Sequence, residues 1–452
     1  MNILNLLNKS PKTALIQNNK PLSYSDLLGK GLAFGERLLK ENLSKGDKIL
    51  LFTPLSIDLY IIMIGAWSVG VTPIFVDFSR GSAFVSESVA RLQPELVIVD
   101  RVTALVSRRY PALAKSQIKT LRYTRPKTAL DKPVLAVPPE HPAIMTLTSG
   151  TTGAPKTIVR SHGFLINQYH MLCNHLDFSA HHIDLGTLAV FTLANLAAGM
   201  TTVLPNKTYK TKNNPQKLAR LAHRHQVSRL IASPTLAREM LAHGTIPSLE
   251  RIYLGGAPVY PSVMKLIPYG HVVYGSTEAE PIACLPFEQV LAIGFGHGLP
   301  VGKPVIPCKI VDGEIMVSGE TVIGDGWHAT GDAGFIDSQG VLHLLGKVKH
   351  CIHDERGTVY PFLVELALDM QFGIRGAVVA KNGKRVLVIE HTELDLEPVI
   401  VQGQEQFGLD EIILHRLEHF ELDSVHMVKK LPMDKRHRAK IEISQEWLAS
   451  IG

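Results

Sequence analysis

The sequence predicts an α/β fold with a large N-terminal lobe of helix-flanked sheets, a small β subdomain and a small, mobile α+β C-terminal lobe. Through the first three quarters of the chain, short β-branched runs alternate with longer amphipathic segments, which is typical of parallel sheets covered by helices. From about Gly294, glycine and proline become frequent and the predicted strands are short. Beyond Lys349 a compact group of strands with one helix follows. We therefore expect one lobe over residues 1–348, including the β subdomain, and another over residues 349–452.

The elements of the large lobe follow from the apolar pattern. The predicted strands are Lys48–Phe52, Leu96–Val99, Ala143–Leu147, Arg229–Ala232, Arg251–Leu254 and Val272–Tyr274. Amphipathic periodicity predicts helices over Ser25–Glu41 and Pro215–His225. The most apolar stretch, Leu55–Val76, contains an aspartate, two glycines and a proline. It therefore favours a buried helix followed by a strand over a membrane span.

The remaining quarter is predicted to be mixed. Short strands of the β subdomain are expected at Lys309–Val311, Glu314–Val317 and Val341–Leu344. In the C-terminal lobe, strands are expected at Gly376–Ala380, Arg385–Glu390 and near Val425–Val428, with a helix at about Gln404–His419.

Composition limits the classes of partner and compartment. A chain of 452 residues is too long for a single core, and 45% apolar with 19% charged residues suits a globular protein. The net charge of +6 is small for this length, so we read it as a solvated surface and expect no nucleic-acid partner. The four cysteines form no C-x-x-C pair, which favours reduced thiols in a cytoplasmic protein. The first residues do not resemble a signal peptide, and no transmembrane segment is expected.

The first motif follows the predicted strand Ala143–Leu147 and reads Thr-Ser-Gly-Thr-Thr-Gly-Ala-Pro-Lys. Glycines and hydroxyls in a tight loop expose N–H and O–H donors that can surround an anion, and a lysine adds a positive charge. The spacing differs from the Walker A motif. The alternative is an ordinary glycine-rich turn, but hydroxyls and glycines this dense favour a phosphate loop. Its candidate binding residues are Thr148, Ser149, Gly150, Thr151, Thr152, Gly153 and Lys156.

Two further motifs follow strands, where ligand sites of parallel sheets gather. Tyr274-Gly-Ser-Thr-Glu278 directly follows the strand Val272–Tyr274. Glu278 is the candidate metal residue because a carboxylate can hold Mg²⁺, and Tyr274 can stack on a base. Leu254-Gly-Gly-Ala-Pro258 follows another strand, and its glycines would let a planar ring approach the backbone. Either segment alone is equally consistent with a plain turn. The candidate binding residues of the two motifs are Gly256, Ala257, Pro258, Tyr274, Gly275, Ser276 and Thr277.

Two charged residues complete the candidate set. In Trp327-His-Ala-Thr-Gly-Asp332, we expect a turn between β segments that places the carboxylate where it can accept hydrogen bonds from both hydroxyls of a ribose. The alternative is an Asx-type turn. Lys440 follows a basic segment near the C-terminus, and a lysine there can neutralise charge that develops on a reacting phosphate.

Taken in order and spacing, these motifs resemble the adenylate-forming superfamily of acyl-CoA synthetases, luciferases and peptide-synthetase adenylation domains. The resemblance runs from Leu22-Ser-Tyr-Ser-Asp-Leu27 to Lys440. It implies ATP as a substrate with Mg²⁺, a carboxylic acid partner, adenine against Gly255–Pro258, and ribose on Asp332. It also implies that Lys440 catalyses adenylation, with Glu278 and Thr151 as the other candidate catalytic residues. A rotation of the C-terminal lobe about Lys349 would separate two half-reactions.

Departures from the family pattern concern the second step. Lys347 stands where the family has an arginine, which turns a forked contact to ribose into a point charge. Thr157 replaces the glycine that commonly follows the phosphate-loop lysine. The segment His353-Asp-Glu-Arg-Gly357 lacks the usual lysine, and its glycine is displaced. Because that glycine helps to pass the thiol arm in CoA-using members, the use of CoA is in question.

A narrower resemblance is to olefin β-lactone synthetases, carried by Pro432-Met-Asp-Lys-Arg-His-Arg-Ala-Lys-Ile441 and Tyr274-Gly-Ser-Thr-Glu-Ala-Glu-Pro281. It implies adenylation of a 3-hydroxy fatty acid, whose own hydroxyl then displaces AMP and closes a lactone. Arg438 departs from the asparagine of that group. Two alternatives stay open: transfer of the acyl group to CoA or to an acyl-carrier protein or other pathway partner, and a non-catalytic nucleotide-binding protein. The small apolar segments Phe191–Gly199 and Ile231–Pro234 would line an acyl pocket, and His162 either flanks that pocket or is structural.

Overall fold

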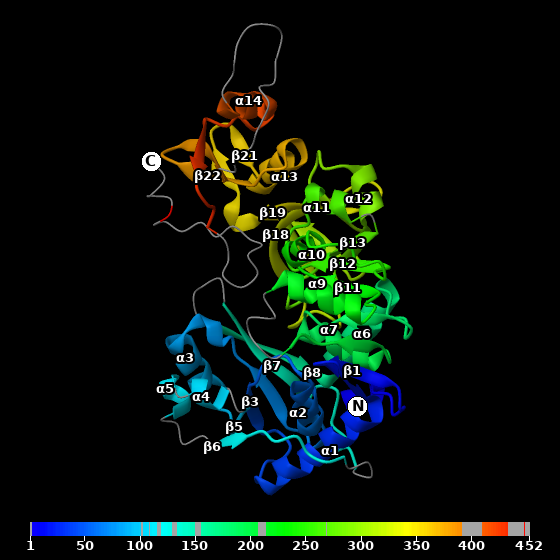
Figure 1. Ribbon diagram of the computed structural model, residues 1–452. Helices are drawn as coiled ribbons and strands as arrows, with labels where there is room; N and C mark the ends of the chain where they lie inside the picture. Colours follow the sequence, from blue (N-terminus) through cyan, green and yellow to red (C-terminus); the bar gives the residue numbers. More distant parts are fainter. Residues whose placement is uncertain are drawn as a thin grey trace. The chain divides into compact units, whose positions relative to one another are not determined.

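The computed structural model describes residues 2–100, 103–107, 109–114, 119–128, 133–149, 155–206, 214–267, 269–390, 409–432 and Trp447. By its internal contacts the chain divides into two compact units (Figure 1). The first comprises Met1–Ile231, Met240–Arg251 and Glu320–Ile323, and the second comprises Ala232–Glu239, Ile252–Gly319 and Gly324–Gly452. The boundary at residue 348 between a large N-terminal lobe and a small, mobile C-terminal lobe stays a prediction. Within the described residues, no helix is long and apolar enough to cross a bilayer.

The first unit contains a six-stranded sheet of order β6-β5-β3-β4-β7-β8, parallel except for the β7–β8 pair. Its strands are β3 (Lys48–Phe52), β4 (Thr72–Phe75), β5 (Leu96–Val99), β6 (Lys119–Arg122), β7 (Pro142–Ser149) and β8 (Pro155–Ser161). Alternate residues of β3 face different cores: Ile49 and Leu51 join one apolar cluster, and Leu50 and Phe52 join another. The sheet is therefore covered on both faces, as the alternating pattern predicts.

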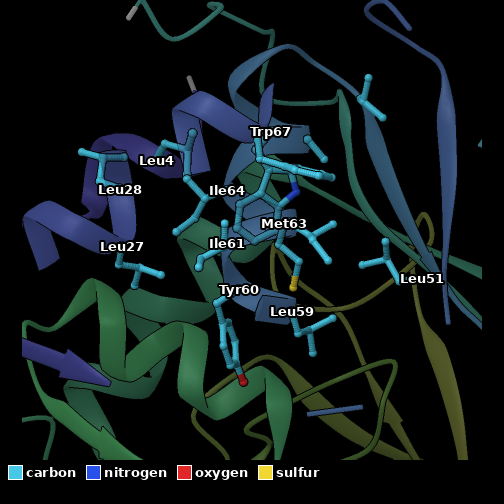
Figure 2. Close-up of a cluster of buried hydrophobic side chains, with 14 of the residues drawn as sticks. Leu4, Leu27, Leu28, Leu51, Leu59, Tyr60, Ile61, Met63, Ile64 and Trp67 are labelled. Carbon is cyan, nitrogen blue, oxygen red and sulfur yellow. The ribbon is translucent and has the colours of Figure 1, made fainter. Parts of the chain in front are cut away.

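Two long helices form much of the first of these cores. They are α1 (Tyr24–Lys40) and α2 (Ile57–Ser68), and Figure 2 shows their apolar side chains packed together with those of neighbouring segments. All residues of α2 are buried, which confirms the helix expected in Leu55–Val76. The backbones approach closely, because a Cβ on Gly65 would lie 2.8 Å from the carbonyl oxygen of Gly31. This helix crossing therefore requires glycine at position 65.

A second group of strands in the first unit has the order β11-β9-β10-β1-β2. These strands are β1 (Thr13–Gln17), β2 (Lys20–Ser23), β9 (Ile183–Leu185), β10 (Thr201–Val203) and β11 (Arg229–Ala232). Further short elements and helices of this unit are η1 (Ile3–Leu6), η2 (Phe78–Arg80), α3 (Ser82–Leu92), α4 (Thr103–Ser107), α5 (Pro111–Ala114), α6 (His162–His175), α7 (Ala189–Ala197) and α9 (Pro215–Arg224). Helix α10 (Pro234–Leu241) begins in the second unit and ends in the first.

The second unit begins with the parallel strands β12 (Arg251–Gly255) and β13 (Gly270–Tyr274), followed by β14 (Ala283–Pro286) antiparallel to β13. Helices α11 (Pro261–Leu266) and α12 (Phe287–Ile293) lie between and after them in the chain. A five-stranded antiparallel sheet of order β15-β19-β18-β17-β16 forms the expected β subdomain. Its strands are β15 (Leu299–Gly302), β16 (Cys308–Val311), β17 (Glu314–Val317), β18 (His328–Ile336) and β19 (Leu342–Lys347).

The rest of the second unit is the small α+β part. A three-stranded sheet of order β22-β23-β24 packs against helices α13 and α14 around one apolar cluster. The elements are η3 (Val348–His350), β20 (Ile352–Asp354), β21 (Gly357–Val359), α13 (Pro361–Phe372), β22 (Gly376–Lys381), β23 (Lys384–Glu390), α14 (Leu409–Arg416), η4 (Glu418–Phe420) and β24 (Ser424–Val428). The helix expected over Gln404–His419 includes α14, which ends at Arg416 and is followed by a 3-10 turn; residues 404–408 lie outside the described residues.

His162 is a structural residue of the first unit. It opens α6 with an exposed fraction of 0%, and its Nδ1 accepts a hydrogen bond of 3.2 Å from the backbone N–H of Ile3. The neutral tautomer with the proton on Nε2 is therefore the one that fits. Its ring stacks on His141, with centroids 5.9 Å apart. Burial, and then the neighbouring His141, lower the pKa of His162 to about 4.

We expect the first unit to lose stability in mild acid because of His162. The unfolded chain takes up this proton near pH 6.5, but the folded chain resists it until about pH 4. Stability supplied by the neutral ring is thus present above pH 6.5 and falls as the pH drops toward 4, by about 3 kcal/mol. Urea unfolding across this range should show a smaller loss for His162→Asn, which keeps an acceptor for Ile3. The exposed His243, changed in the same way, serves as the control; equal pH slopes for all three proteins would refute the assignment.

Candidate active site

The second unit brings two of the predicted motifs to the same edge of a sheet. Strands β12 and β13 are parallel neighbours, with Gly255 opposite Val273, so their carboxyl ends lie side by side. Gly256–Pro258 follows the first strand and Gly275–Glu278 follows the second. A Cβ on Gly255 would lie 2.7 Å from the carbonyl oxygen of Val273, which explains the glycine at the strand end. Gly256 has a φ of +76°, a conformation that glycine adopts readily.

The turn after β13 is closed by its own backbone. The N–H of Ser276 donates to the carbonyl oxygen of Ala279 at 2.7 Å, and the N–H of Ala279 donates back at 3.2 Å. The Oγ of Ser276 accepts from the N–H of Glu278 at 3.3 Å. Thr277 is exposed and Glu278 is partly exposed. Among the described residues, the Glu278 carboxylate has no hydrogen-bond or ion-pair partner, so its oxygens are available to a cation.

A hydrogen-bonded trio joins this turn to the β subdomain. The Tyr274 hydroxyl donates to Oδ2 of Asp332 at 3.0 Å, and Nζ of Lys347 lies 2.7 Å from Oδ1 of the same carboxylate. The side chain of Lys347 is 40% exposed and that of Asp332 is 17% exposed. Burial, followed by the charge of Asp332, raises the pKa of Tyr274 above its usual value. The tyrosine therefore stays a neutral donor that orients Asp332.

The sequence predicted a turn at Asp332, but this prediction was wrong. Asp332 lies within β18 and pairs with Lys347 of β19, and the register shifts between Ala333 and Gly334. The preceding residue, Gly331, has a φ of +72°. Because β19 pairs with β18 at this position, the strand continues past Asp332. The local sequence does not show which strand will be its partner.

The expected phosphate loop lies partly in strands. Thr148 and Ser149 end β7, Lys156 lies in β8, and Thr148 pairs with Lys156 across an antiparallel hairpin. The prediction of a loop was therefore wrong at these positions, because the strand pairing extends to the tip. Gly150, Thr151, Thr152 and Gly153 lie outside the described residues.

The remaining candidates fall in different places. Lys440 lies outside the described residues. Lys349 is exposed in η3, directly after the strand that carries Lys347. Phe191 and Ile231 are buried in α7 and β11 of the first unit. All four cysteines are free thiols, as expected.

Sequence reasoning missed a salt-bridge network that fixes the β20–β21 hairpin, the segment in which the family pattern is altered. Arg385 of β23 binds Asp354 through Nε at 2.8 Å and Nη2 at 2.6 Å. Arg356 in the hairpin turn binds Asp423 with contacts of 2.9 and 3.1 Å. These ion pairs lower the pKa of Asp354 to about 2, with the hydrogen bond from Arg385 as the main cause. The hairpin is thus tied to the sheet by two forked contacts.

Sequence reasoning also missed a second set of polar contacts, between α11 and α13, made by Tyr260, Ser262, Glu365 and Asp369. One signal was present in the sequence. Pro261 begins α11, and the residue before it, Tyr260, is not a capping residue type. Such a helix start calls for a hydrogen-bond acceptor from elsewhere in the chain.

Comparison with known proteins adds a family and a fold. A family model described as "AMP-binding enzyme" matches residues 6–327. The chain is 26% identical to an olefin beta-lactone synthetase of Stenotrophomonas maltophilia (strain K279a), over 93% of this chain and 89% of that protein. It is 24% identical to a 2-succinylbenzoate–CoA ligase of Bacillus licheniformis, over 94% of this chain and 95% of that protein.

Among solved structures, the ATP-bound MatB from Rhodopseudomonas palustris matches with a TM-score of 0.79 and 19% identity, covering 97% of each chain. At that identity the match establishes the fold alone. It confirms the α/β class predicted from the alternating pattern.

Proposed function

Because the chain belongs to the AMP-binding enzyme family, we propose that it activates a fatty or 3-hydroxy fatty acid with ATP and then closes the product to a β-lactone. The observation that carries the first step is the trio of Tyr274, Asp332 and Lys347 beside two loops at adjacent strand ends. Such an edge, with a carboxylate held for two hydroxyls, suits a nucleotide. The acid oxygen attacks the α-phosphorus of ATP, and the bond to pyrophosphate breaks.

Each candidate residue has a proposed part in this step. Gly256, Ala257 and Pro258 lie against adenine, and Asp332 accepts hydrogen bonds from ribose, with Tyr274 orienting the carboxylate. The segment from Thr148 to Lys156 binds phosphate, and Thr151 within it is one of the catalytic residues. Lys440 neutralises the charge that develops at the α-phosphate.

The Glu278 carboxylate fits Mg²⁺. It is partly exposed, and magnesium commonly uses one or two carboxylates together with water and substrate phosphates. The cation would supply positive charge to the phosphates, while this chain supplies the oxygen that places it.

Two observations support a thiol-free second step. The similarity to an olefin beta-lactone synthetase covers 93% of the chain. In addition, Arg356 and Asp354 hold the β20–β21 hairpin on its sheet, where CoA-using relatives of the superfamily pass a thiol arm. In the proposed step the 3-hydroxyl oxygen attacks the acyl carbon, the bond from that carbon to AMP breaks, and the hydroxyl proton is released. An attack within one molecule gains effective concentration, which helps to offset ring strain.

Transfer to CoA or to a carrier-protein thiol is the second candidate. The similarity to a 2-succinylbenzoate–CoA ligase over 94% of the chain favours it. Both candidates need two steps at one site, and we propose that residues 349–452 rotate about Lys349 between them.

We expect product formation without any thiol. The protein, with Mg-ATP and a panel of fatty and 3-hydroxy fatty acids, should release pyrophosphate and give a product of the 3-hydroxy acid lighter by one water, with or without CoA. Pyrophosphate release and product mass are read together. A product that forms only with CoA would replace the lactone by a thioester. No pyrophosphate with any acid, together with ATP binding in isothermal titration, would support the non-catalytic alternative.

A further inference from the structure

The N-terminus of helix α11 is capped by a residue of α13, more than 100 residues further along the chain. Its N-cap residue, Tyr260, offers no side-chain cap. Instead the carboxylate of Asp369 in α13 accepts from the backbone N–H of Ser262 at 2.8 Å and from the Ser262 hydroxyl at 2.6 Å. Asp369 is only 8% exposed, so these bonds are made away from bulk water. A charged acceptor on helix N–H groups forms strong hydrogen bonds.

A second contact lies one turn earlier on α13. The Tyr260 hydroxyl donates to Oε2 of Glu365 at 2.7 Å, and the ring of Tyr260 meets Phe362 edge-on at 6.1 Å. Glu365 and Asp369 are four residues apart and thus lie on one helix face. α11 supplies hydrogen-bond donors to both side chains. We call Tyr260, Ser262, Glu365 and Asp369 the α11–α13 clamp.

The clamp joins the two sides of Lys349. Helix α11 precedes that residue and α13 follows it. At the same place, a Cβ on Gly346 would lie 2.7 Å from the Cβ of Phe362, so β19 and α13 are in close contact. A rotation about Lys349 that carries α13 away from α11 would break all three clamp hydrogen bonds together. It would also leave the start of α11, three residues after Pro258, without its cap.

We propose that Glu365 and Asp369 are positioning residues which hold α13 and the sheet β22–β23–β24 in one of two working orientations and, through α11, fix the shape of the Gly256–Pro258 loop. This inference rests on the proposed function for its two half-reactions. The clamp contacts stand independently of that function. Opening the clamp would coincide with loosening of the loop, so the orientation of α13 and the affinity for the nucleotide are coupled.

Protonation of Glu365 modulates the clamp. Burial raises the pKa of this carboxyl from 4.5 to about 7, although the hydrogen bond from Tyr260 opposes the rise. The other charged groups near the clamp are Asp369 and Arg375, which act on Tyr260, and Arg238 of α10, which interacts with Asp369, Arg375 and Glu239. The clamped form therefore binds the proton more tightly than an open form with an exposed carboxyl. Clamping is strongest in mild acid and weakens as the pH rises from about 4.5 to 7.

Hydrogen exchange of the full-length protein tests the clamp directly. We expect Asp369→Asn, which leaves one acceptor for two donors, to lower the protection of the amides at residues 262–264 about 10-fold or more. Protection in β22 and β23 should remain. After correction for intrinsic exchange, wild-type protection of these amides should fall between pH 5 and 7.5, and Glu365→Gln should remove that trend. Gln371→Ala, an exposed change on the same helix, is the matched control.

Activity provides the second readout. We expect both clamp variants to change the ratio of acid-dependent ATP–pyrophosphate exchange to product formation at least about 3-fold, because they shift an equilibrium between orientations. Equal losses in both half-reactions, or unchanged protection at residues 262–264, would overturn the proposal. Absence of exchange activity in the wild type with every acid would count against the proposed function, while the protection data would still decide the clamp.

Discussion

Replacing Lys440 by alanine is expected to slow adenylate formation about 10²–10³-fold, the scale of losing one preorganised charge contact at a reacting group. Negative charge grows on the α-phosphate as the carboxylate attacks it, and an ammonium group placed there stabilises the transition state more than the bound substrates. ATP binding should therefore persist. The measurement is the rate of acid-dependent pyrophosphate release, with the ATP affinity taken separately by isothermal titration.

Lys435→Ala is the matched control for this prediction, because it removes the same charge from the same basic segment five residues earlier. It should leave the rate within about 3-fold, since no contact with the reacting phosphate is proposed for this lysine and a charge without such a contact contributes little. Near-normal pyrophosphate release in Lys440→Ala would remove Lys440 from the mechanism. An equal loss in both variants would indicate a role of the whole basic segment in binding, not a specific catalytic lysine.

The elements predicted most closely were those fixed by local pattern. The strands Lys48–Phe52, Leu96–Val99 and Glu314–Val317 have the predicted bounds. Each is a short apolar or alternating run between polar or glycine-containing segments, so the local sequence indicates where the strand begins and ends. Helix α1 was predicted to within one residue at each end, because Ser23 caps it and its periodicity stops at Glu41.

Predictions failed where a partner distant in sequence decides the structure. Asp332 was placed in a turn between β segments, but pairing with β19 keeps it in a strand. The ends of β7 and β8 were assigned to a loop because their residues are small and polar, although the hairpin extends to Ser149 and Pro155. Register between strands is set by tertiary contacts, which no single segment encodes.

In the candidate site, too, local motifs could be predicted from the sequence, but contacts between distant residues could not. The motifs Gly255–Pro258 and Tyr274–Glu278 could be found because glycines and a carboxylate at strand ends have a local signature. The bond from Tyr274 to Asp332 spans 58 positions, and the clamp bond from Tyr260 to Glu365 spans 105. Tyrosine and carboxylate side chains of this kind occur throughout a sequence without forming a pair, so only the fold reveals which of them meet.

Asp332→Asn is expected to raise the KM for ATP by about 10²-fold, because the site loses the charged acceptor proposed for both ribose hydroxyls and each such hydrogen bond contributes about 1.5–3 kcal/mol. The fold should be retained, since asparagine has the same size and can still accept from Tyr274. The turnover rate at saturating ATP should change much less than KM, because ribose contacts are already made in the bound substrate. Steady-state pyrophosphate release over a range of ATP concentrations measures both quantities. Asp325→Asn, an exposed change seven residues earlier, is the control.

Lys347 decides how this result is interpreted. Its ammonium group forms an ion pair with Asp332 at 2.7 Å, so ribose must share a carboxylate that already has two partners. If Asp332 binds ribose, Lys347→Ala should leave the carboxylate in place and change the KM for ATP less than Asp332→Asn does. If the ion pair serves only to join β18 and β19, the two variants should lose thermal stability alike and keep the ATP dependence of the wild type. The ordering of the two KM values therefore separates a ribose ligand from a structural salt bridge between neighbouring strands.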